Sequence, residues 1–282
     1  MIRCRSRLSA QGDRAPPAGS PRPSVLLLVL LLVWASAALA GPPYVTDDPE
    51  PVDYQHWEFY VASQNVKAAD GWSGTAPHFE VNYGVLPEVQ LHFIGPLAYD
   101  RPTGGEWHYG YGDTELGVKC RFVPETDWRP QVGVFPMLEL PTGNSGNDLG
   151  SGHVEAFLPV WLQKSFGPWT VYGGAGYGIN PGVGNRDWTY VGAVAQHHLA
   201  ENVLVGAELY HRTRTEVGGD PDTAFNLGTV LDLTENHHLL FSAGRSLDGP
   251  TRFQVYVAYQ LTFGPEKVST HGVPSLWCGP SR

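Results

Sequence analysis

Charged and apolar residues alternate along one stretch of this chain, residues 112–122, whose sequence is GDTELGVKCRF. Successive side chains of a β-strand point to opposite faces, so a strand with this sequence has one charged face and one apolar face. A half-buried strand of a soluble protein gives the same pattern, and the rest of the chain has to decide which solvent meets each face. The charged residues are Asp113, Glu115, Lys119 and Arg121, and the apolar ones are Leu116, Val118, Cys120 and Phe122.

The first forty residues have the pattern of a cleaved secretory signal. Five arginines between Arg3 and Arg22 form a basic region, residues 25–34 are apolar, and Ala38-Leu39-Ala40 is a small-x-small cleavage site. The apolar core is too short to span a bilayer comfortably, which argues against a membrane anchor. We therefore expect residues 1–40 to be a signal peptide and the protein to be exported.

The composition after residue 40 excludes several classes of protein. Five of the 18 basic residues and one of the 28 acidic residues lie in the signal, so the remainder has 13 basic and 27 acidic residues and a net charge of −14. Nucleic acid as a partner is not expected, because binding it requires a basic face. Cys120 and Cys278 are far apart and form no C-x-x-C pair, so neither a zinc site nor a disulfide framework is implied, although a bridge between them stays open. No later stretch is long and apolar enough for a transmembrane helix.

Runs with a period of two recur along the chain and predict twelve strands. Several of the runs are nine to twelve residues long, the length that crosses a bilayer at a steep tilt. The predicted strands are residues 57–64, 77–83, 89–94, 111–122, 131–140, 153–164, 170–178, 187–199, 203–213, 223–233, 237–245 and 251–263.

The links between these strands alternate in length. Residues 84–88, 166–168, 200–202 and 234–236 are short links, whereas residues 65–76, 95–110, 142–152 and 179–186 are longer ones, and only residues 123–130 break the rule. Short turns on one rim and long loops on the other are typical of an outer-membrane barrel, with the turns in the periplasm. A soluble β-sandwich would also alternate along its strands and remains the alternative on pattern alone.

Aromatic residues near the ends of the predicted strands suggest interfacial girdles. The residues assigned to the girdles are Trp57, Tyr83, Phe122, Trp161, Trp169, Trp188 and Phe263.

If the apolar faces of the strands meet lipid, the charged faces line a lumen. The reverse orientation is excluded for residues 112–122, because one Arg or Lys facing lipid at the bilayer midplane costs about 2 to 4 kcal/mol. The lumenal charges either pair across the barrel and hold its shape, or they form a mixed-charge passage whose acidic bias favours neutral or cationic solutes. The predicted lumen-lining residues are Glu58, Glu80, Asp113, Glu115, Lys119, Arg121, Glu139, Glu155, Glu208, Arg212 and Arg252.

No residue pattern predicts catalysis, a cofactor or a metal. The chain has no G-x-S-x-G sequence, so a lipid hydrolase built on a barrel is the less favoured alternative. The pairs His197-His198 and His237-His238 place adjacent side chains on opposite faces of a strand. The acidic residues 46–53 lack the spacing of a calcium loop. We expect residues 41–56 to be an extended periplasmic arm, and the sequence leaves open whether this arm folds into the barrel mouth as a plug.

Four segments resemble a known family. They are residues 43–64 (PYVTDDPEPVDYQHWEFYVASQ), residues 112–122, residues 133–144 (GVFPMLELPTGN) and residues 158–182 (LPVWLQKSFGPWTVYGGAGYGINPG). The chain resembles a family of proteobacterial outer-membrane β-barrels described as transporters of the MetA pathway of phenol degradation. The resemblance covers nearly the whole chain from the end of the signal peptide to Phe263. The resemblance implies uptake of small, often aromatic, solutes, and it transfers no catalytic or substrate-contact residue.

The prediction is an all-β protein: a single antiparallel up-and-down transmembrane barrel of about twelve strands over residues 57–263, followed by a tail at residues 264–282. We expect it in the outer membrane as a channel for small organic solutes, aromatic ones among them, and not as an enzyme. Its expected partners are outer-membrane lipids, lipopolysaccharide and the solutes themselves; the oligomeric state is not predicted. The alternative is a non-conducting barrel, structural or binding an external partner through its long loops.

Overall fold

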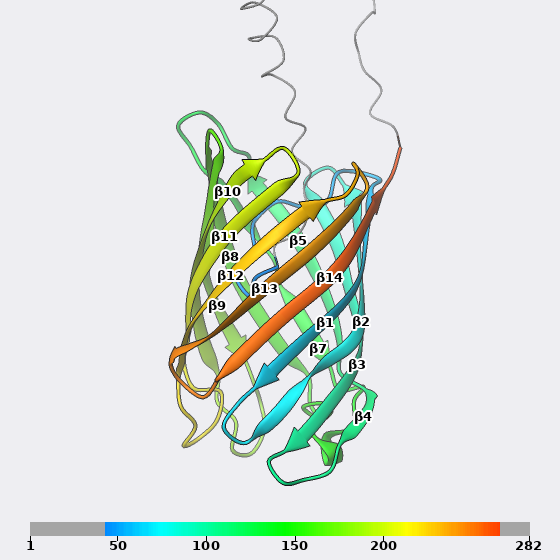
Figure 1. The fold of residues 1–282 in the computed structure, drawn as a ribbon, viewed down its shortest axis with the longest axis vertical. Coiled ribbons are helices and arrows are strands. Elements are labelled where there is room, and N and C mark those ends of the chain that lie inside the picture. The colour runs from blue at the N-terminus through cyan, green and yellow to red at the C-terminus, as the bar shows by residue number, and fades with distance from the viewer. Residues whose placement is uncertain (1–42, 266–282) are drawn as a thin grey trace, which may run out of the picture. The chain divides into compact units, whose positions relative to one another are not determined.

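The computed structural model describes residues 43–265, which form a β-barrel (Figure 1). The predicted signal peptide and nearly all of the predicted tail, including Cys278, lie outside the described residues. The only helix among residues 43–265 is one turn of 3₁₀ helix, η1 (Ser145–Asn147), and no helix there is long and apolar enough to cross a bilayer.

Fourteen β elements make up the wall, and every neighbouring pair is antiparallel. Since β4 and β5 both pair with β3, and β6 and β7 both bridge β5 and β8, these four short elements form two interrupted strands. The barrel therefore has twelve strands, as the sequence predicted. The elements are β1 (Trp57–Lys67), β2 (Gly71–Leu86), β3 (Val89–Pro102), β4 (His108–Tyr111), β5 (Thr114–Val123), β6 (Gln131–Val134), β7 (Met137–Leu140), β8 (Glu155–Phe166), β9 (Trp169–Ile179), β10 (Trp188–Ala200), β11 (Val203–Arg212), β12 (Asp222–Asp232), β13 (His237–Asp248) and β14 (Phe253–Phe263).

The first and last strands close the barrel. β1 pairs with β14 over its whole length, from Trp57 opposite Phe263 to Lys67 opposite Phe253. Closure leaves no unpaired sheet edge, which is the condition that allows a sheet to span a bilayer. The register is regular along this seam and shifts at only a few places elsewhere, such as between Ala62 and Gln64 opposite β2.

The two rims differ in the length of their connections (Figure 1). Residues 87–88, 167–168 and 201–202 are tight turns on the rim where β1 begins and β14 ends, here called the short-turn rim. Residues 141–154, 180–187 and 213–221 are on the opposite, long-loop rim. The sequence predicted this asymmetry, and it has exceptions: residues 124–130 are a longer link on the short-turn rim, and residues 68–70 are a tight turn on the long-loop rim.

Two of the predicted long loops are wrong. Most of residues 65–76 and 95–110 is strand, because β1 and β2 are joined by residues 68–70 alone and β3 continues to Pro102. Glycines and prolines in these stretches suggested loops, but the strands extend as a hairpin supported by ring contacts. The Tyr99 and Trp107 rings are 5.6 Å apart, and the Lys67 ammonium is 5.5 Å from the centre of the Trp72 ring.

The alternation of residues 112–122 sorts side chains between two environments. Leu116, Val118 and Phe122 are exposed on the outside at 40%, 41% and 57%, whereas Lys119 is buried inside at 5%. Apolar residues on the outer face and polar residues inside are the distribution of a barrel that sits in lipid.

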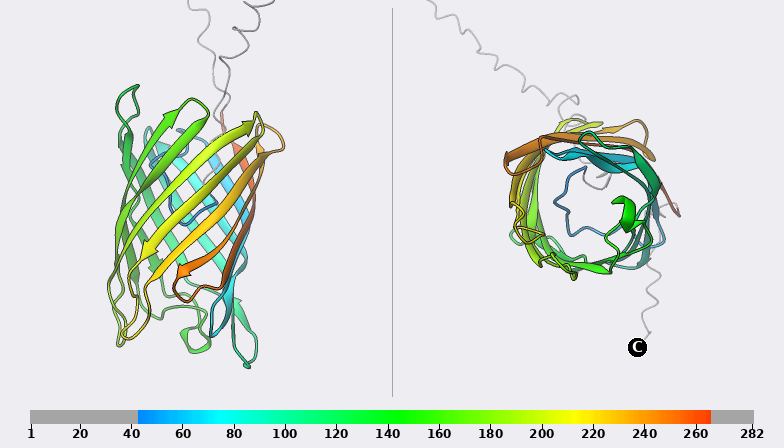
Figure 2. Two further views of the ribbon diagram at one scale, coloured as in Figure 1. Left: turned by 60° about the vertical axis from the view of Figure 1, so that its left-hand side comes forward. Right: turned by 90° about the horizontal axis from the view of Figure 1, so that it is seen from below.

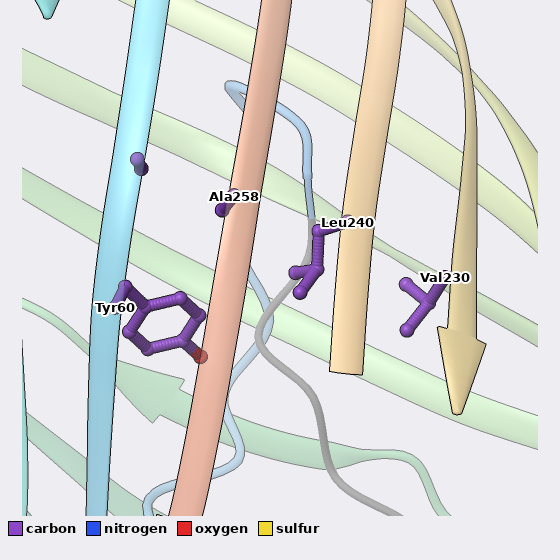
Figure 3. Packing of buried hydrophobic residues seen from close by; sticks show 5 residues of the cluster. Tyr60, Val230, Leu240 and Ala258 are labelled. Atoms are coloured by element: carbon purple, nitrogen blue, oxygen red, sulfur yellow. The ribbon is translucent and has the colours of Figure 1, made fainter. Parts of the chain in front are cut away.

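A small apolar cluster lies on the inner face of the wall at β1, β14, β13 and β12. Tyr60, Ala258, Leu240 and Val230 lie on these four neighbouring strands and are nearly inaccessible to solvent (Figure 3). The hydroxyl of Tyr60 accepts a hydrogen bond of 2.8 Å from Nε2 of Gln260, which gives this polar atom a partner inside the cluster.

Candidate functional site in the barrel lumen

The chain before β1 lies inside the barrel. Figure 2 shows this segment, residues 43–56, here called the arm, within the ring of strands when the barrel is seen along its axis. At one end of the arm, Ser242 of β13 donates a hydrogen bond to the carbonyl of Pro43. Further along, the backbone N–H of Val52 donates to Oε1 of Gln90 on β3 at 2.9 Å. The arm thus crosses the lumen from one wall to the other, which answers the question that the sequence left open.

Glu208 on β11 is the anchor of the arm. Its carboxylate accepts hydrogen bonds from the backbone N–H groups of Val45 at 3.3 Å and Thr46 at 2.5 Å. The amide of Asn226 donates a third hydrogen bond at 2.6 Å. Glu208 and Thr46 are both buried, so these charge-assisted bonds replace the water that the two groups lose.

Three glycines make room for the arm on the inner face of the wall. A Cβ at Gly192 on β10 would clash with the hydroxyl of Thr46. A Cβ at Gly206 on β11 or Gly228 on β12 would lie within 3 Å of the hydroxyl of Tyr44. Glycine in a strand often marks a close approach of another segment, and here that segment is the arm.

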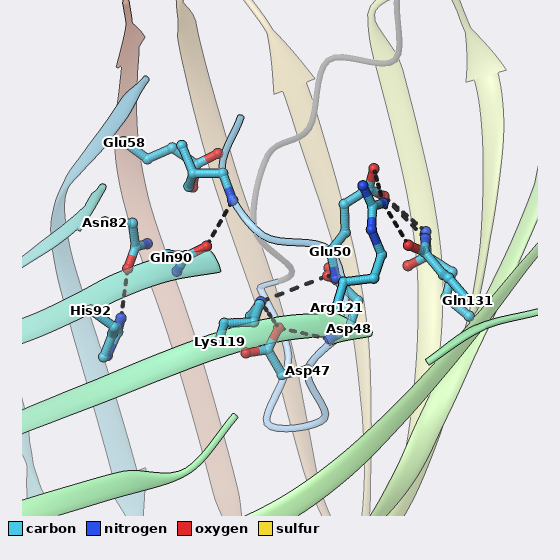
Figure 4. A network of polar contacts seen from close by, with 12 residues as sticks. Asp47, Asp48, Glu50, Glu58, Asn82, Gln90, His92, Lys119, Arg121 and Gln131 are labelled. Carbon is cyan, nitrogen blue, oxygen red and sulfur yellow. Dashed lines mark hydrogen bonds and ion pairs between the residues drawn. The ribbon is translucent and has the colours of Figure 1, made fainter. Parts of the chain in front are cut away.

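The basic residues of β5 bind the acidic residues of the arm (Figure 4). Nζ of Lys119 lies 3.0 Å from Oδ1 of Asp47 and 3.7 Å from Oδ1 of Asp48. Nη1 of Arg121 lies 3.4 Å from Oε1 of Glu50, while its Nε donates to Glu88 at the short-turn rim. The cationic half of the charged face of β5 is therefore neutralised by the arm together with Glu88.

A central cavity of about 290 Å³ remains between the arm and the inner face of the wall. Its polar lining comes from both the arm and strands β1, β2, β3 and β5, and its apolar lining comes largely from aromatic rings. The cavity is lined by the carboxyl groups of Asp47, Asp48, Glu50, Glu58, Glu80 and Glu115, the bases His78, His92 and Lys119, and the rings of Tyr44, Tyr60, Phe135, Phe157, Trp161 and Tyr256, among others.

His92 links two of these acids. Its Nε2 is 2.8 Å from Oε1 of Glu115. Its Nδ1 is 2.7 Å from Oδ1 of Asn82, as Figure 4 shows. The same Nδ1 is 3.6 Å from Oε1 of Glu80, which also accepts a hydrogen bond of 2.8 Å from Asn82. Both ring nitrogens of His92 therefore face oxygen atoms.

Glu58 differs from the other acids of the cavity. It is buried and accepts a hydrogen bond of 2.8 Å from the hydroxyl of Tyr60. Within residues 43–265, no basic group lies within ion-pair distance of Glu58.

An aromatic ladder runs from the long-loop rim toward the central cavity; we define it as Trp188, Phe157, Trp161, Tyr190 and Tyr210. The rings of Trp188 and Phe157 are stacked 4.9 Å apart, and those of Phe157 and Trp161 meet edge to face at 6.4 Å. Tyr190 lies 6.1 Å from Trp161 and stacks on Tyr210 at 5.6 Å.

The ladder corrects the prediction that Trp161 and Trp188 belong to the girdles. Trp161 is only 1% exposed, and Trp188 packs on the inward-facing Phe157. Trp161 occupies the same face of β8 as Gln163, whose amide donates to Glu50 of the arm at 3.1 Å. The position of a ring in the alternation, and not its distance from the strand end, decides its side of the wall.

A second space of about 400 Å³, here called the vestibule, lies at the long-loop rim. Asp113 and Glu139 line it together with Asp148. The carboxylate of Asp113 accepts hydrogen bonds from the backbone N–H groups of Gly143 at 2.8 Å and Ser151 at 2.6 Å. These bonds fold residues 141–154 toward the lumen, so the mouth is narrowed by its own loop.

The predicted lumen-lining residues thus fall into four places. Arg212 and Arg252 are exposed at the long-loop rim. The guanidinium of Arg212 lies 6.0 Å from the centre of the Trp188 ring, and Arg252 directly precedes β14 in the chain. Glu155 lies near this rim, with one oxygen 3.3 Å from Nε2 of His153. The others are Glu58, Glu80, Glu115 and Lys119 at the central cavity, Arg121 and Glu208 at the arm, and Asp113 and Glu139 at the vestibule.

Sequence reasoning missed several residues of the lumen. The arm acids were noted but not connected to the wall, and His92 was not singled out. The sequence did hold a signal for three rings of the ladder: Phe157 and Trp161 share the face of the predicted inward Glu155 on β8, and Tyr210 shares that of Glu208 on β11. No predicted inward residue lies on β10, so Tyr190 had no such signal.

Outside the spanning strands, one acid on the long-loop rim is held in its charged form. The backbone N–H of Asn180 and the hydroxyl of Tyr177 both donate to Asp187, at 2.9 and 2.8 Å, and they lower the pKa of its carboxyl group. Over residues 43–265, no group of three His, Cys, Asp or Glu side chains is arranged to hold a metal ion.

Comparisons with known proteins support the fold. No family model and no curated protein matches the sequence, so the resemblance to the MetA-pathway family stays a prediction. Among solved structures, the COG4313 outer membrane channel from Pseudomonas putida F1 is similar with a TM-score of 0.61 and 18% identity, over 77% of this chain and 98% of that one. The KdgM porin in complex with disordered oligogalacturonate is similar with a TM-score of 0.50 and 11% identity, over 74% of this chain and 99% of that one.

Proposed function

We propose that the protein is an outer-membrane channel through which small organic solutes, aromatic ones among them, cross by passive diffusion. The observation that carries this proposal is the central cavity, a space with polar and aromatic walls inside a closed barrel whose outer face is apolar. The two similar structures are an outer membrane channel and a porin, which supports the same class of function and not an enzyme. We assign no catalytic residue and no cofactor.

The proposed path enters at the long-loop rim. A solute passes through the vestibule, moves along the aromatic ladder and reaches the central cavity beside the arm. On the other side of the arm, a further cavity of about 220 Å³ is lined by Asn226, Ser242 and Gln254. The arm divides the lumen, so we expect a narrow pore with low conductance rather than the wide opening of a larger porin.

The long-loop rim has features that suit contact with outer-membrane lipids and lipopolysaccharide. Lys67, Trp72 and Arg101 lie directly opposite one another across β1, β2 and β3. The Arg101 guanidinium also lies 5.1 Å from the centre of the Trp107 ring. Cations beside aromatic rings at the membrane interface attract anionic headgroups. In this orientation the long loops are external, and the short-turn rim faces the periplasm.

Planar-bilayer recording and liposome swelling with the refolded protein test the proposal. We expect a small ionic conductance, together with swelling in solutes of one-ring size and slower swelling in larger ones. A barrel that keeps its heat-modifiable mobility in gels, yet gives neither conductance nor swelling, would exclude the channel.

A second candidate is a non-conducting barrel whose long loops bind an external partner. The observation in its favour is that the arm and residues 141–154 both fill the lumen and are tied to its wall. Deletion of residues 142–152 separates the two functions. Solute flux should survive in a channel, whereas binding of cells or matrix to the loops should be lost in an adhesive barrel.

A further inference from the structure

We propose that the central cavity is a binding site for a small organic cation that carries an aromatic ring. This inference rests on the proposed passage through the lumen and deepens it by naming the class of solute that the cavity selects. The site has an acidic side, made by β1, β2, β3, β5 and the arm, and an aromatic side that includes Phe157 and Trp161 of the aromatic ladder.

The acids of the cavity outnumber the bases. Six carboxyl groups line the cavity, and the bases that approach them within ion-pair distance among the described residues are Lys119, Arg121 and His92. Lys119 and Arg121 already bind Asp47, Asp48 and Glu50 of the arm. Six carboxylates against Lys119, Arg121 and a protonated His92 leave three formal negative charges, and Arg121 is also shared with Glu88 outside the cavity, so the cavity has room for a further cation.

The excess charge lies mainly on two strands. Glu58 on β1 has a hydroxyl donor but, in the described chain, no basic group within ion-pair distance, and Glu80 on β2 shares a single histidine with Glu115. A buried carboxylate is costly without a counter-charge. A solute cation between Glu58 and Glu80 would supply that charge.

The aromatic side of the cavity suits the body of such a solute. Phe157 and Trp161 present rings to the cavity, and the wall already holds one cation over a ring, since Nζ of Lys119 lies 5.0 Å from the centre of Phe135. A cation over an aromatic face gains more when it is desolvated, as it would be here. In addition, the buried indole N–H of Trp161 has no hydrogen-bond acceptor among residues 43–265, so it is free to donate to a bound molecule or its π face.

The size of the cavity limits the solute to about one ring. An apolar cavity of roughly 150 Å³ is enough to hold benzene. A volume of about 290 Å³ therefore accommodates a benzene ring with a short ammonium substituent.

The entrance favours the same charge. The vestibule is lined by Asp113, Glu139 and Asp148. A mouth lined by acidic groups concentrates cations and disfavours anions before they reach the cavity. Two successive acidic regions therefore lie on the path from the long-loop rim.

Current block in planar bilayers tests the proposal with three charged probes. Benzyltrimethylammonium has the ring and the permanent positive charge, tetramethylammonium lacks the ring, and benzenesulfonate has the ring with the opposite charge. We expect benzyltrimethylammonium to block at concentrations about ten-fold or more below the other two. Equal potency of benzenesulfonate overturns the charge requirement, and equal potency of tetramethylammonium overturns the aromatic one.

Variants assign the effect to the cavity. We expect Glu58→Gln and Glu80→Gln each to weaken the block by benzyltrimethylammonium about ten-fold, while Glu201→Gln, at an exposed turn on the short-turn rim, leaves it unchanged. Two single variants guard against one of them failing to fold. Block that persists in both folded variants places the cation elsewhere and refutes the assignment.

Binding measured without conduction separates this inference from the proposed function. Equilibrium dialysis of radiolabelled benzyltrimethylammonium against the detergent-solubilised barrel should show saturable binding that Glu58→Gln weakens. Binding without any conductance would remove the channel and keep the site. Flux of neutral benzyl alcohol without selective binding of the cation would keep the channel and remove the site.

Discussion

Replacement of Glu208 by alanine should release the arm from the wall. The carboxylate accepts two hydrogen bonds from the arm, at 2.5 Å from Thr46 and 3.3 Å from Val45, and no other side chain on β11 bonds to the arm. Because Thr46 is fully buried, its N–H would lose its partner without gaining water. The variant thus removes the main polar contact of the arm with this part of the lumen.

The expected size of the effect follows from these two bonds. A hydrogen bond to a charged group contributes about 1.5 to 3 kcal/mol, and the longer of the two bonds counts for less. A loss of about 3 kcal/mol in arm docking corresponds to roughly a hundred-fold rise in the undocked fraction. Glu208→Gln keeps one acceptor oxygen and should have an intermediate effect.

A buried cysteine reports this change. Thr46→Cys, in a background with Cys120→Ser and Cys278→Ser, places a thiol of similar size at a fully buried position of the arm. We expect a water-soluble maleimide to label it about a hundred-fold faster when Glu208→Ala is added, and the single-channel conductance to rise. Glu201→Ala is the matched control. An unchanged labelling rate in a barrel that is still closed would refute the role of Glu208 as an anchor.

Three further predictions concern the wall and the long-loop rim. Cys120 lies on the same face of β5 as the exposed Val118 and Phe122. In a background with Cys278→Ser, its thiol should resist water-soluble maleimides in the membrane and react with membrane-permeant ones; equal rates would place it in the lumen. Asp113→Ala removes the acceptor of two backbone N–H groups of residues 141–154; a loss of about 3 kcal/mol should expose this loop to proteases, whereas Asp220→Ala, in another loop of the same rim, should not. The pKa of Asp187 is lowered by hydrogen bonds that its charged form accepts, so these bonds stabilise residues 180–187 above the ordinary pKa of about 3.9 and are lost as the pH falls through the lower, folded value. Hydrogen exchange at the Asn180 amide should follow this titration, and Asp187→Asn should abolish its pH dependence.

The sequence specifies the wall of the barrel because the side on which a wall residue lies depends only on its position within its own strand. Lys119 and its neighbours Val118 and Cys120 must point to opposite sides of a strand, and lipid accepts only the apolar set. The strand count and the two rims follow from the same period and from the positions of the turns. Even Trp161, one of the two tryptophans assigned to the wrong side, is correctly placed once its position in the alternation along β8 is used.

The contacts of the arm in the lumen join residues that are far apart in the sequence, and the sequence does not predict these contacts. Thr46 and Glu208 are separated by 162 residues, and Asp47 and Lys119 by 72. Nothing near Asp47 in the sequence distinguishes an acid that faces solvent from one that meets a lysine across a barrel. The sequence around the glycines at positions 192, 206 and 228 does not show why glycine is needed there. The space that they leave is filled by the arm, which comes much earlier in the chain.

The position of the arm also orders the steps by which the protein acquires its structure. The arm precedes β1, yet it is held by Gln90 on β3, Lys119 on β5, Glu208 on β11 and Ser242 on β13. These strands lie on both sides of the seam between β1 and β14, so the arm makes its full set of contacts only in the closed barrel. A fully docked arm is therefore a sign that the last strand has been added and the barrel is closed.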